Sequence, residues 1–128
     1  MTFFDALADS VLIIHGVYVA FVVAGGVAAL WWRHIIWIHV PAVVWAALVE
    51  LKGWICPLTP LENWLRCQAG DAGYAGGFVE HYLAPLLYPV GLTREMQVFL
   101  GMSVLLGNGA VYWWVLHWGM NRSERRRV

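Results

Sequence analysis

Charged residues are scarce in this chain: only 12% of its 128 residues are Asp, Glu, Lys or Arg, against about 25% in a typical soluble domain. Cysteine occurs twice, without the C-x-x-C spacing of redox-active thiols or the C-x-x-C-H sequence that attaches c-type haem. Hydrolase, kinase and phosphate-binding motifs are also missing. The one basic run, RSERRR, is short, so nucleic acid is not expected as a partner. The composition therefore argues against a soluble domain.

Long apolar segments are what the chain has instead. Three runs contain no Asp, Glu, Lys or Arg, and each is near the roughly 20 residues that a helix needs to cross a ~30 Å hydrocarbon core. The middle run is short, but it reaches Cys56 if Glu50 and Lys52 are tolerated. We therefore expect a single all-α integral membrane domain in contact with the lipid bilayer. Its three transmembrane helices should lie at about 10–32, 35–55 and 95–118, with a basic tail at 119–128.

The basic residues near the ends of these helices predict the orientation. Arg33 and the arginines of the tail lie on one side of the membrane, and Lys52, Arg66 and Arg94 lie on the other. Because the side with more Lys and Arg faces the cytoplasm, we expect a cytoplasmic C-terminus and an external N-terminus in a bacterial inner membrane. The first residues lack the basic region of a signal peptide, so the first helix is expected to be retained.

The segment CPLTPLENWLRC, between the second and third runs, begins an outer helical cap that we expect at about 57–92. Thr59 followed by Pro60 and Glu62 is typical of a helix start with a capping box, which predicts a helix over 60–68. An apolar face opposite Glu62 suits a short helix at the membrane interface. That face would consist of Leu61, Trp64 and Leu65.

Two further features of the cap can be predicted. The apolar part of 74–90 is short and contains Glu80, His81 and Pro85, which favours an interfacial or re-entrant helix over a fourth crossing. Cys56 and Cys67 flank the first cap helix, and thiols on the external side meet an oxidising compartment. We therefore expect a Cys56–Cys67 disulfide, with two free thiols as the alternative if the helix holds them too far apart.

Ionisable side chains at membrane depth are candidates for function, because they are costly there. His39 and Glu50 fall on one face of the second helix, since eleven residues bring the helix back to nearly the same direction. Depth along the chain also predicts an outer cluster of His15, Glu50 and His81, with Tyr82 or Glu80. The candidate cofactor-binding residues are therefore His15, His39, Glu50, His81 and Tyr82.

Several chemistries fit these residues. Two histidines on facing helices could hold haem b, and the set His15, Glu50 and His81 could hold a transition metal. A His and Glu pair could instead pass protons, act as acid and base on a lipid-like substrate, or hydrogen-bond a quinone head group. The alternative is that each group is a structural residue that joins helices by hydrogen bonds.

Small residues predict close helix packing. Gly16, Ala20, Ala24 and Ala28 recur at four-residue spacing on the first helix, a pattern that lets another helix approach closely. Asn108 on the third helix needs a hydrogen-bond partner at this depth. A non-catalytic accessory or scaffold subunit, packed with a second copy or within a larger membrane complex, is therefore the alternative to a redox protein.

Three stretches carry a resemblance to a known family. They are LIIHGVYVAFVVAGGVAAL, IWIHVPAVVWAALVELKGWICPLTPLENWLR, and GYAGGFVEHYLAPLLYP followed by GLTRE. Over about Ala8 to Leu116, the chain resembles the domain-of-unknown-function 2784 family of small bacterial membrane proteins. The resemblance implies an integral membrane protein with three or four helices, and it implies no chemistry. The positions that match the family pattern are His15, Gly25, Gly26, His39, Glu50, Cys56, Pro57, Thr59, Glu62, Tyr74, Gly77, His81, Tyr82 and Pro89.

Overall fold

A computed structural model describes residues 2–75, 79–83, 85 and 93–125 of the chain. Within these ranges all regular structure is helical, as predicted. The α-helices are α1 (Phe3–Ala28), α2 (Ile36–Lys52), α3 (Leu58–Ala69) and α5 (Arg94–Arg125). They are joined by a 3-10 turn, η1 (Arg33–Ile35), and a π-helical turn, η2 (Val79–Leu83).

The described residues contain three helical segments long and apolar enough to cross a membrane: Phe3–Ala28, Arg33–Lys52 and Arg94–Gly119. Many large hydrophobic side chains on these segments point outward, which suits a lipid environment rather than water. This confirms the prediction of an all-α membrane protein with three crossings.

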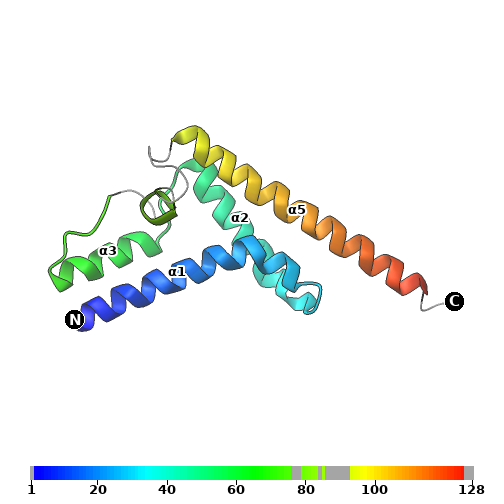
Figure 1. Ribbon diagram of the computed structural model, residues 1–128, viewed down its shortest axis with the longest axis horizontal. Coiled ribbons are helices and arrows are strands. Elements are labelled where there is room, and N and C mark those ends of the chain that lie inside the picture. The colour runs from blue at the N-terminus through cyan, green and yellow to red at the C-terminus, as the bar shows by residue number, and fades with distance from the viewer. Residues whose placement is uncertain (1, 76–78, 84, 86–92, 126–128) are drawn as a thin grey trace.

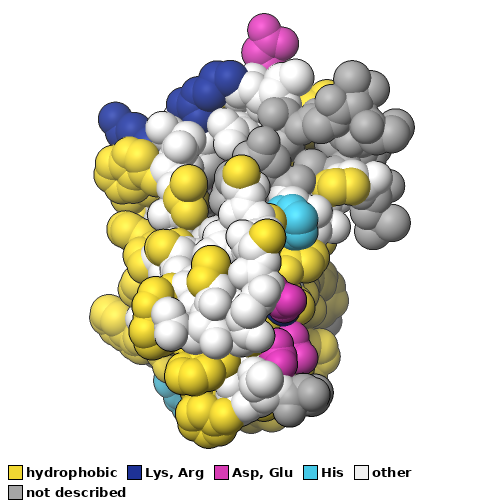
Figure 2. Space-filling view, turned by 90° about the vertical axis from the view of Figure 1, so that its left-hand side faces the viewer, with side chains coloured by type: hydrophobic (Ala, Val, Ile, Leu, Met, Phe, Trp, Pro, Cys, Tyr) yellow, Lys and Arg dark blue, Asp and Glu magenta, His cyan; other side chains and the backbone are white. Residues whose placement is uncertain are grey.

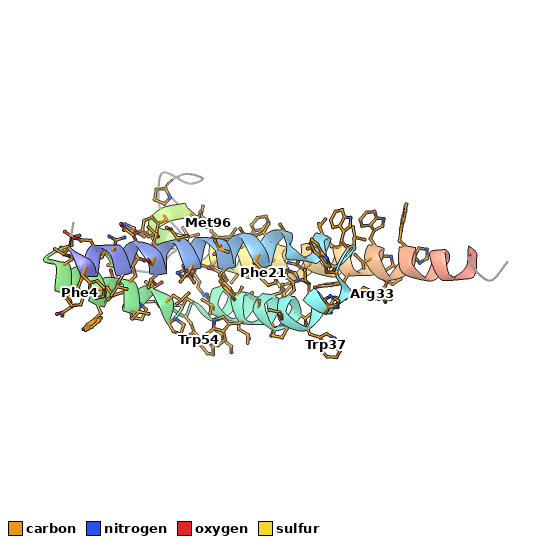
Figure 3. All side chains as sticks on the ribbon, turned by 90° about the horizontal axis from the view of Figure 1, so that it is seen from below. Phe4, Phe21, Arg33, Trp37, Trp54 and Met96 are labelled. Carbon is orange, nitrogen blue, oxygen red and sulfur yellow. The ribbon has the colours of Figure 1, made fainter. Side chains whose placement is uncertain are left out.

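The helices form two side-by-side pairs, α1 with α3 and α2 with α5, and the second pair meets the C-terminal half of α1. Figure 1 shows α3 beside the N-terminal half of α1, while α2 lies beside α5 and both contact α1. Seen from below, α2 and α3 follow one another along α1, with Trp37 and Trp54 pointing away from the helices (Figure 3). The chain therefore places the two successive helices α2 and α3 against α1.

Several boundaries differ from those expected from the apolar runs. α1 begins at Phe3 because Thr2 and Asp5 form a capping box, with the Asp5 carboxylate 2.6 Å from the Thr2 amide nitrogen. α2 ends where Gly53 adopts φ +68, a left-handed conformation that favours glycine. α5 continues through the predicted tail to Arg125, and residues 126–128 lie outside the described residues.

The predicted start of the cap helix is wrong. α3 begins at Leu58, with Pro57 at the N-cap position and no side-chain capping bond, so Thr59 lies inside the first turn. The Glu62 carboxylate does not turn back to cap the helix, because other side chains hold it, as described below. Of the predicted segment 74–90, Tyr74, Ala75, the η2 turn and Pro85 lie within the described residues.

Candidate functional site

His39 lies where the three crossing helices meet, and it is fully buried. Its Nε2 lies 3.2 Å from the Val22 carbonyl oxygen on α1, and its Nδ1 lies 2.5 Å from the Tyr112 hydroxyl on α5. A carbonyl oxygen can only accept, so Nε2 carries the proton and Nδ1 accepts the Tyr112 hydrogen. Both ring nitrogens of this predicted ligand are therefore engaged within the chain.

Asn108 completes this junction from α5. Its amide nitrogen donates to the Val22 carbonyl oxygen at 3.1 Å and to the Val104 carbonyl oxygen at 2.8 Å. The Val22 carbonyl thus receives donors from both α2 and α5. The prediction that Asn108 needs a partner at this depth is confirmed, and the partner is backbone. We call His39, Asn108, Tyr112 and the Val22 carbonyl the His39 junction.

Two glycines let these side chains reach α1. A Cβ atom at Gly25 would lie 2.5 Å from the His39 ring and 2.9 Å from the Phe21 ring. At Gly26 it would lie 3.2 Å from Val111 and 3.4 Å from the Asn108 side-chain oxygen. The glycine pair therefore allows α2 and α5 to approach α1 closely at the His39 junction.

A second polar group lies between α1, α3 and η2, around the fully buried side chain of Glu62. The carboxylate accepts hydrogen bonds from Arg66 Nε at 2.9 Å, the Tyr74 hydroxyl at 2.8 Å and the Tyr82 hydroxyl at 2.9 Å. Because one donor is a guanidinium, the carboxylate is compensated in charge as well as in hydrogen bonding. We call Glu62, Arg66, Tyr74 and Tyr82 the Glu62 centre.

The environment of the Glu62 centre raises the pKa of its two tyrosines. Burial, and then the hydrogen bond to the Glu62 carboxylate, raise the pKa of Tyr74 and of Tyr82 above the ordinary value of 10.0. Both phenols therefore remain donors at neutral pH, and the carboxylate keeps its partners.

Groups around the Glu62 centre extend it to α1 and to the surface. Arg66 forms an ion pair with Asp9 at 3.5 Å, and His15 lies near enough to Glu62 to interact electrostatically. The exposed His81 ring stacks on Tyr74 with ring centres 4.0 Å apart. Of the predicted outer cluster, His15, His81 and Tyr82 are thus gathered around Glu62, a residue that the sequence placed on the outer polar face of its helix.

Glu50 lies elsewhere, at the contact between α2 and α5. A Cβ atom at Gly101 would be 3.3 Å from its side chain, and Arg94 interacts electrostatically with it. Among the described residues no group of three His, Cys, Asp or Glu side chains could hold a metal ion. The structure does not support the predicted metal set of His15, Glu50 and His81, because Glu50 lies at the α2–α5 contact, apart from His15 and His81. The side chain of Glu80 lies outside the described residues.

The predicted disulfide is also wrong, since Cys56 and Cys67 are both free thiols. Cys67 lies nine positions beyond Leu58 in an unbroken helix. At about 1.5 Å per residue, Leu58 and Cys67 are roughly 14 Å apart along the helix, and Cys56 precedes Leu58. This distance is about twice the span of a disulfide.

The predicted packing stripe of α1 points away from α2, α3 and α5. Ala20 and Ala24 are exposed, and no neighbouring atom lies within 4 Å of a Cβ placed at Gly16, while Ala28 is half-buried. The buried face of α1 is formed instead by Ala8, His15, Val22, Gly25 and Gly26. Among the described residues, Gly16, Ala20 and Ala24 therefore lie away from the contacts between helices.

Comparisons with known proteins found a family match but no individual relative. Neither the curated proteins nor the solved structures contain a match to the chain. A family model with the description "Protein of Unknown function (DUF2784)" matches residues 5–113, which include the His39 junction and the Glu62 centre. The chain therefore belongs to the domain-of-unknown-function 2784 family.

Proposed function

We propose that the protein is a non-catalytic accessory or scaffold protein of the bacterial inner membrane, which packs against a transmembrane helix of a second copy or of another membrane protein. The charge distribution supports an external N-terminus and a cytoplasmic C-terminus. The observation that carries the proposal is the outward position of Gly16, Ala20 and Ala24 on α1.

Within the membrane, such a stripe favours association because small side chains let two helix backbones approach closely. Ile13 and Val17 lie on one side of it and Val23 on the other. They are 65%, 62% and 66% exposed, so an approaching helix would meet small residues between larger ones. The polar residues of the His39 junction support the same role, because they are used to fasten α1, α2 and α5 to one another. The surface of α1 at Gly16, Ala20 and Ala24 therefore offers a partner close packing rather than polar groups.

Energy transfer between donor- and acceptor-labelled copies in lipid vesicles tests self-association, and co-purification with a membrane partner tests the heteromeric form. Ala20→Leu would overfill the stripe at a cost of roughly 1–3 kcal/mol, or about five- to 150-fold in affinity. Ala110→Leu is the matched control, since Ala110 is also exposed on a crossing helix. A variant pair with equal association, or a wild-type protein that is monomeric and partner-free, would contradict the proposal.

A second candidate function, acid–base or quinone chemistry, rests on the Glu62 centre. A buried carboxylate with two phenols, an arginine and a nearby histidine is an arrangement found at acid–base sites and also in structural networks. Solvent extraction of the purified protein tests it: a quinone present in the wild type and absent from Glu62→Gln would favour this candidate over the accessory role.

A further inference from the structure

Two close contacts fix the level of α2 relative to α5, and they show that the two helices are antiparallel. Near the end of α2, a Cβ atom at Gly101 would lie 3.3 Å from the Glu50 side chain. Closer to the start of α2, His39 Nδ1 lies 2.5 Å from the Tyr112 hydroxyl. Glu50 and His39 are eleven residues apart on α2, and so are Gly101 and Tyr112 on α5. Levels on the two helices therefore correspond residue for residue between these contacts.

α1 is parallel to α5 and ends on the same side of the His39 junction. The Val22 carbonyl oxygen accepts from the Asn108 amide nitrogen at 3.1 Å, and a Cβ atom at Gly26 would lie 3.2 Å from Val111. Moving from the first contact to the second advances both helices toward their C-termini. α1 ends at Ala28, two residues past Gly26, so the α1–α2 turn lies at the level of the C-terminal part of α5.

Most tryptophans of the chain are gathered at this end of the three crossing helices. Continuing the register six residues beyond His39 and Tyr112 brings Arg33 to the level of Trp118. Six of the nine tryptophans lie on the α1–α2 turn, the start of α2 and the C-terminal part of α5, in a band that covers roughly 8 Å along α5. Their side chains are 47% to 83% exposed. We call these six side chains the tryptophan belt: Trp31, Trp32, Trp37, Trp113, Trp114 and Trp118.

Arg33 adds a positive charge at the level of the belt. Its side chain is exposed, and it forms no hydrogen bond or ion pair with the residues that the structure describes. An exposed cation among indole rings is suited to the headgroup layer of a bilayer, where phosphate is available and tryptophan is enriched.

The opposite end of the helices lies about one hydrocarbon thickness away from the belt. From Arg33 to Lys52 the helical segment rises roughly 28 Å, near the ~30 Å thickness of a hydrocarbon core. The same number of residues counted back from Trp118 reaches Phe99 on α5. Between these levels, α2 and α5 contain one Asp, Glu, Lys or Arg, which is Glu50. Figure 2 looks onto this opposite end of the molecule, where acidic and basic side chains reach the surface.

We infer that the tryptophan belt binds the phospholipid headgroup layer of the leaflet at the α1–α2 turn, and that the hydrocarbon core reaches from the belt to the level of Lys52 and Phe99. Indole rings bind in this layer because each combines a large apolar surface with one N–H donor. Lipid phosphate there gives Arg33 a counter-ion. α5 continues past the α1–α2 turn in Figure 1, so its last turn before Arg125 extends out of the bilayer on this side.

Three exposed positions on one face of α5 form a depth ladder that tests this placement. Glu95, Leu106 and His117 follow one another at eleven-residue spacing, which is about three helical turns or roughly 16 Å, and His117 lies within the belt. Each is replaced in turn by a nitroxide-labelled cysteine in a full-length Cys56→Ser, Cys67→Ser background, reconstituted in phosphatidylethanolamine and phosphatidylglycerol vesicles. The ratio of label collisions with oxygen, which concentrates in lipid, to collisions with a water-soluble nickel complex rises with depth. A second set of vesicles contains a lipid whose headgroup chelates nickel, which broadens the spectra of labels in the headgroup layer.

The expected result is a collision ratio at Leu106→Cys several-fold higher than at Glu95→Cys or His117→Cys, with the His117 label broadened by headgroup nickel. A ratio at His117 that equals or exceeds the one at Leu106 would overturn the inference, because the belt would then lie among acyl chains. A His117 label that meets soluble nickel but not headgroup nickel would place the belt in water and also overturn it. A His117 label protected from every collision partner would do the same, because another protein would then cover the belt.

Discussion

At the scale of single residues, three of the buried polar side chains, His39, Asn108 and Glu62, occur in hydrogen-bonded sets. His39, Asn108 and Tyr112 form one set, and Glu62 with its three donors forms the other. A polar group left unsatisfied away from water costs several kcal/mol, so each set stabilises the contact in which it lies. Of the residues that the sequence marks as possible ligands, His39 and Tyr82 are thereby engaged in contacts between helical segments.

Close contact at Gly25 can be tested by adding one methyl group. Gly25→Ala places a Cβ 2.5 Å from the His39 ring, so the junction must shift and the free energy of unfolding should fall by roughly 1–3 kcal/mol. Gly16→Ala is the control, because that position is open. Unfolding in detergent micelles measures both, and equal stability of the two variants would show that the junction is looser than described.

Glu62 should matter more than its place on a short helix suggests. Glu62→Ala removes the acceptor of Arg66, Tyr74 and Tyr82 and should lower the free energy of unfolding by roughly 3–5 kcal/mol, the cost of breaking a buried ion pair. Glu62→Gln keeps one acceptor oxygen and should lose less. Glu95→Ala, at an exposed acid in the first turn of α5, should change stability little. A tolerated Glu62→Ala would mean that the Glu62 centre contributes little to the fold.

Alkaline pH should weaken the same centre. The pKa of Tyr74 and of Tyr82 is raised in the folded state above the ordinary value of 10.0. Their contribution to stability is therefore complete below pH ~10 and is lost as pH rises through the folded values. Unfolding free energies measured across this range should fall more steeply for the wild type than for the Tyr74→Phe, Tyr82→Phe double variant. Identical slopes would argue against the shift.

Part of this residue pattern is predictable from sequence. Histidines inside apolar runs, and an asparagine between glycines, can be recognised as needing partners because nothing nearby in the chain can solvate them. Glu62 could not be identified as buried, because it sits among polar neighbours and its donors Tyr74 and Tyr82 are 12 and 20 residues away. The available sequence signal is the apolar pair Leu61 and Trp64 beside Glu62, because only one face of α3 can be buried against α1.

At the scale of helices, apolar runs predict which segments cross the membrane better than they predict where helices end. α1 extends well beyond its apolar run because its capping box lies at Thr2, and α5 extends beyond its run because polar residues also form good helix. α3 differs most from expectation, because the burial of Glu62 depends on contacts with distant residues that no local pattern encodes. The predicted disulfide failed for the same reason, since an intact α3 keeps the cysteines apart.

The contact between the end of α2 and the start of α5 offers a test at this scale. Arg94, the first residue of α5, donates to the carbonyl oxygens of Glu50 and Leu51 at the end of α2. Arg94→Met should remove this cap and lower the free energy of unfolding by roughly 1–2 kcal/mol. Lys52→Met is the control, because Lys52 has no hydrogen bond or ion pair among the described residues. Equal losses for both variants would indicate a general charge effect instead of a specific cap.

At the scale of the whole molecule, three crossing helices are held together at the His39 junction, and α3 is held to α1 at the Glu62 centre. This division explains why a chain with so many candidate ligands lacks, in its described part, a cluster that could hold a metal. The outward stripe of Gly16, Ala20 and Ala24 on α1 contributes to neither of these two contacts. The proposed accessory role rests on this stripe.

The most direct test of this account is the absorption spectrum of the protein purified from haem-replete cells, recorded oxidised and after reduction. Both ring nitrogens of His39 are engaged by Val22 and Tyr112, so we predict a spectrum of tryptophan and tyrosine alone, without a Soret band. A Soret band with sharp reduced α and β bands, lost in His39→Ala, would contradict the account and show that the junction opens to bind haem.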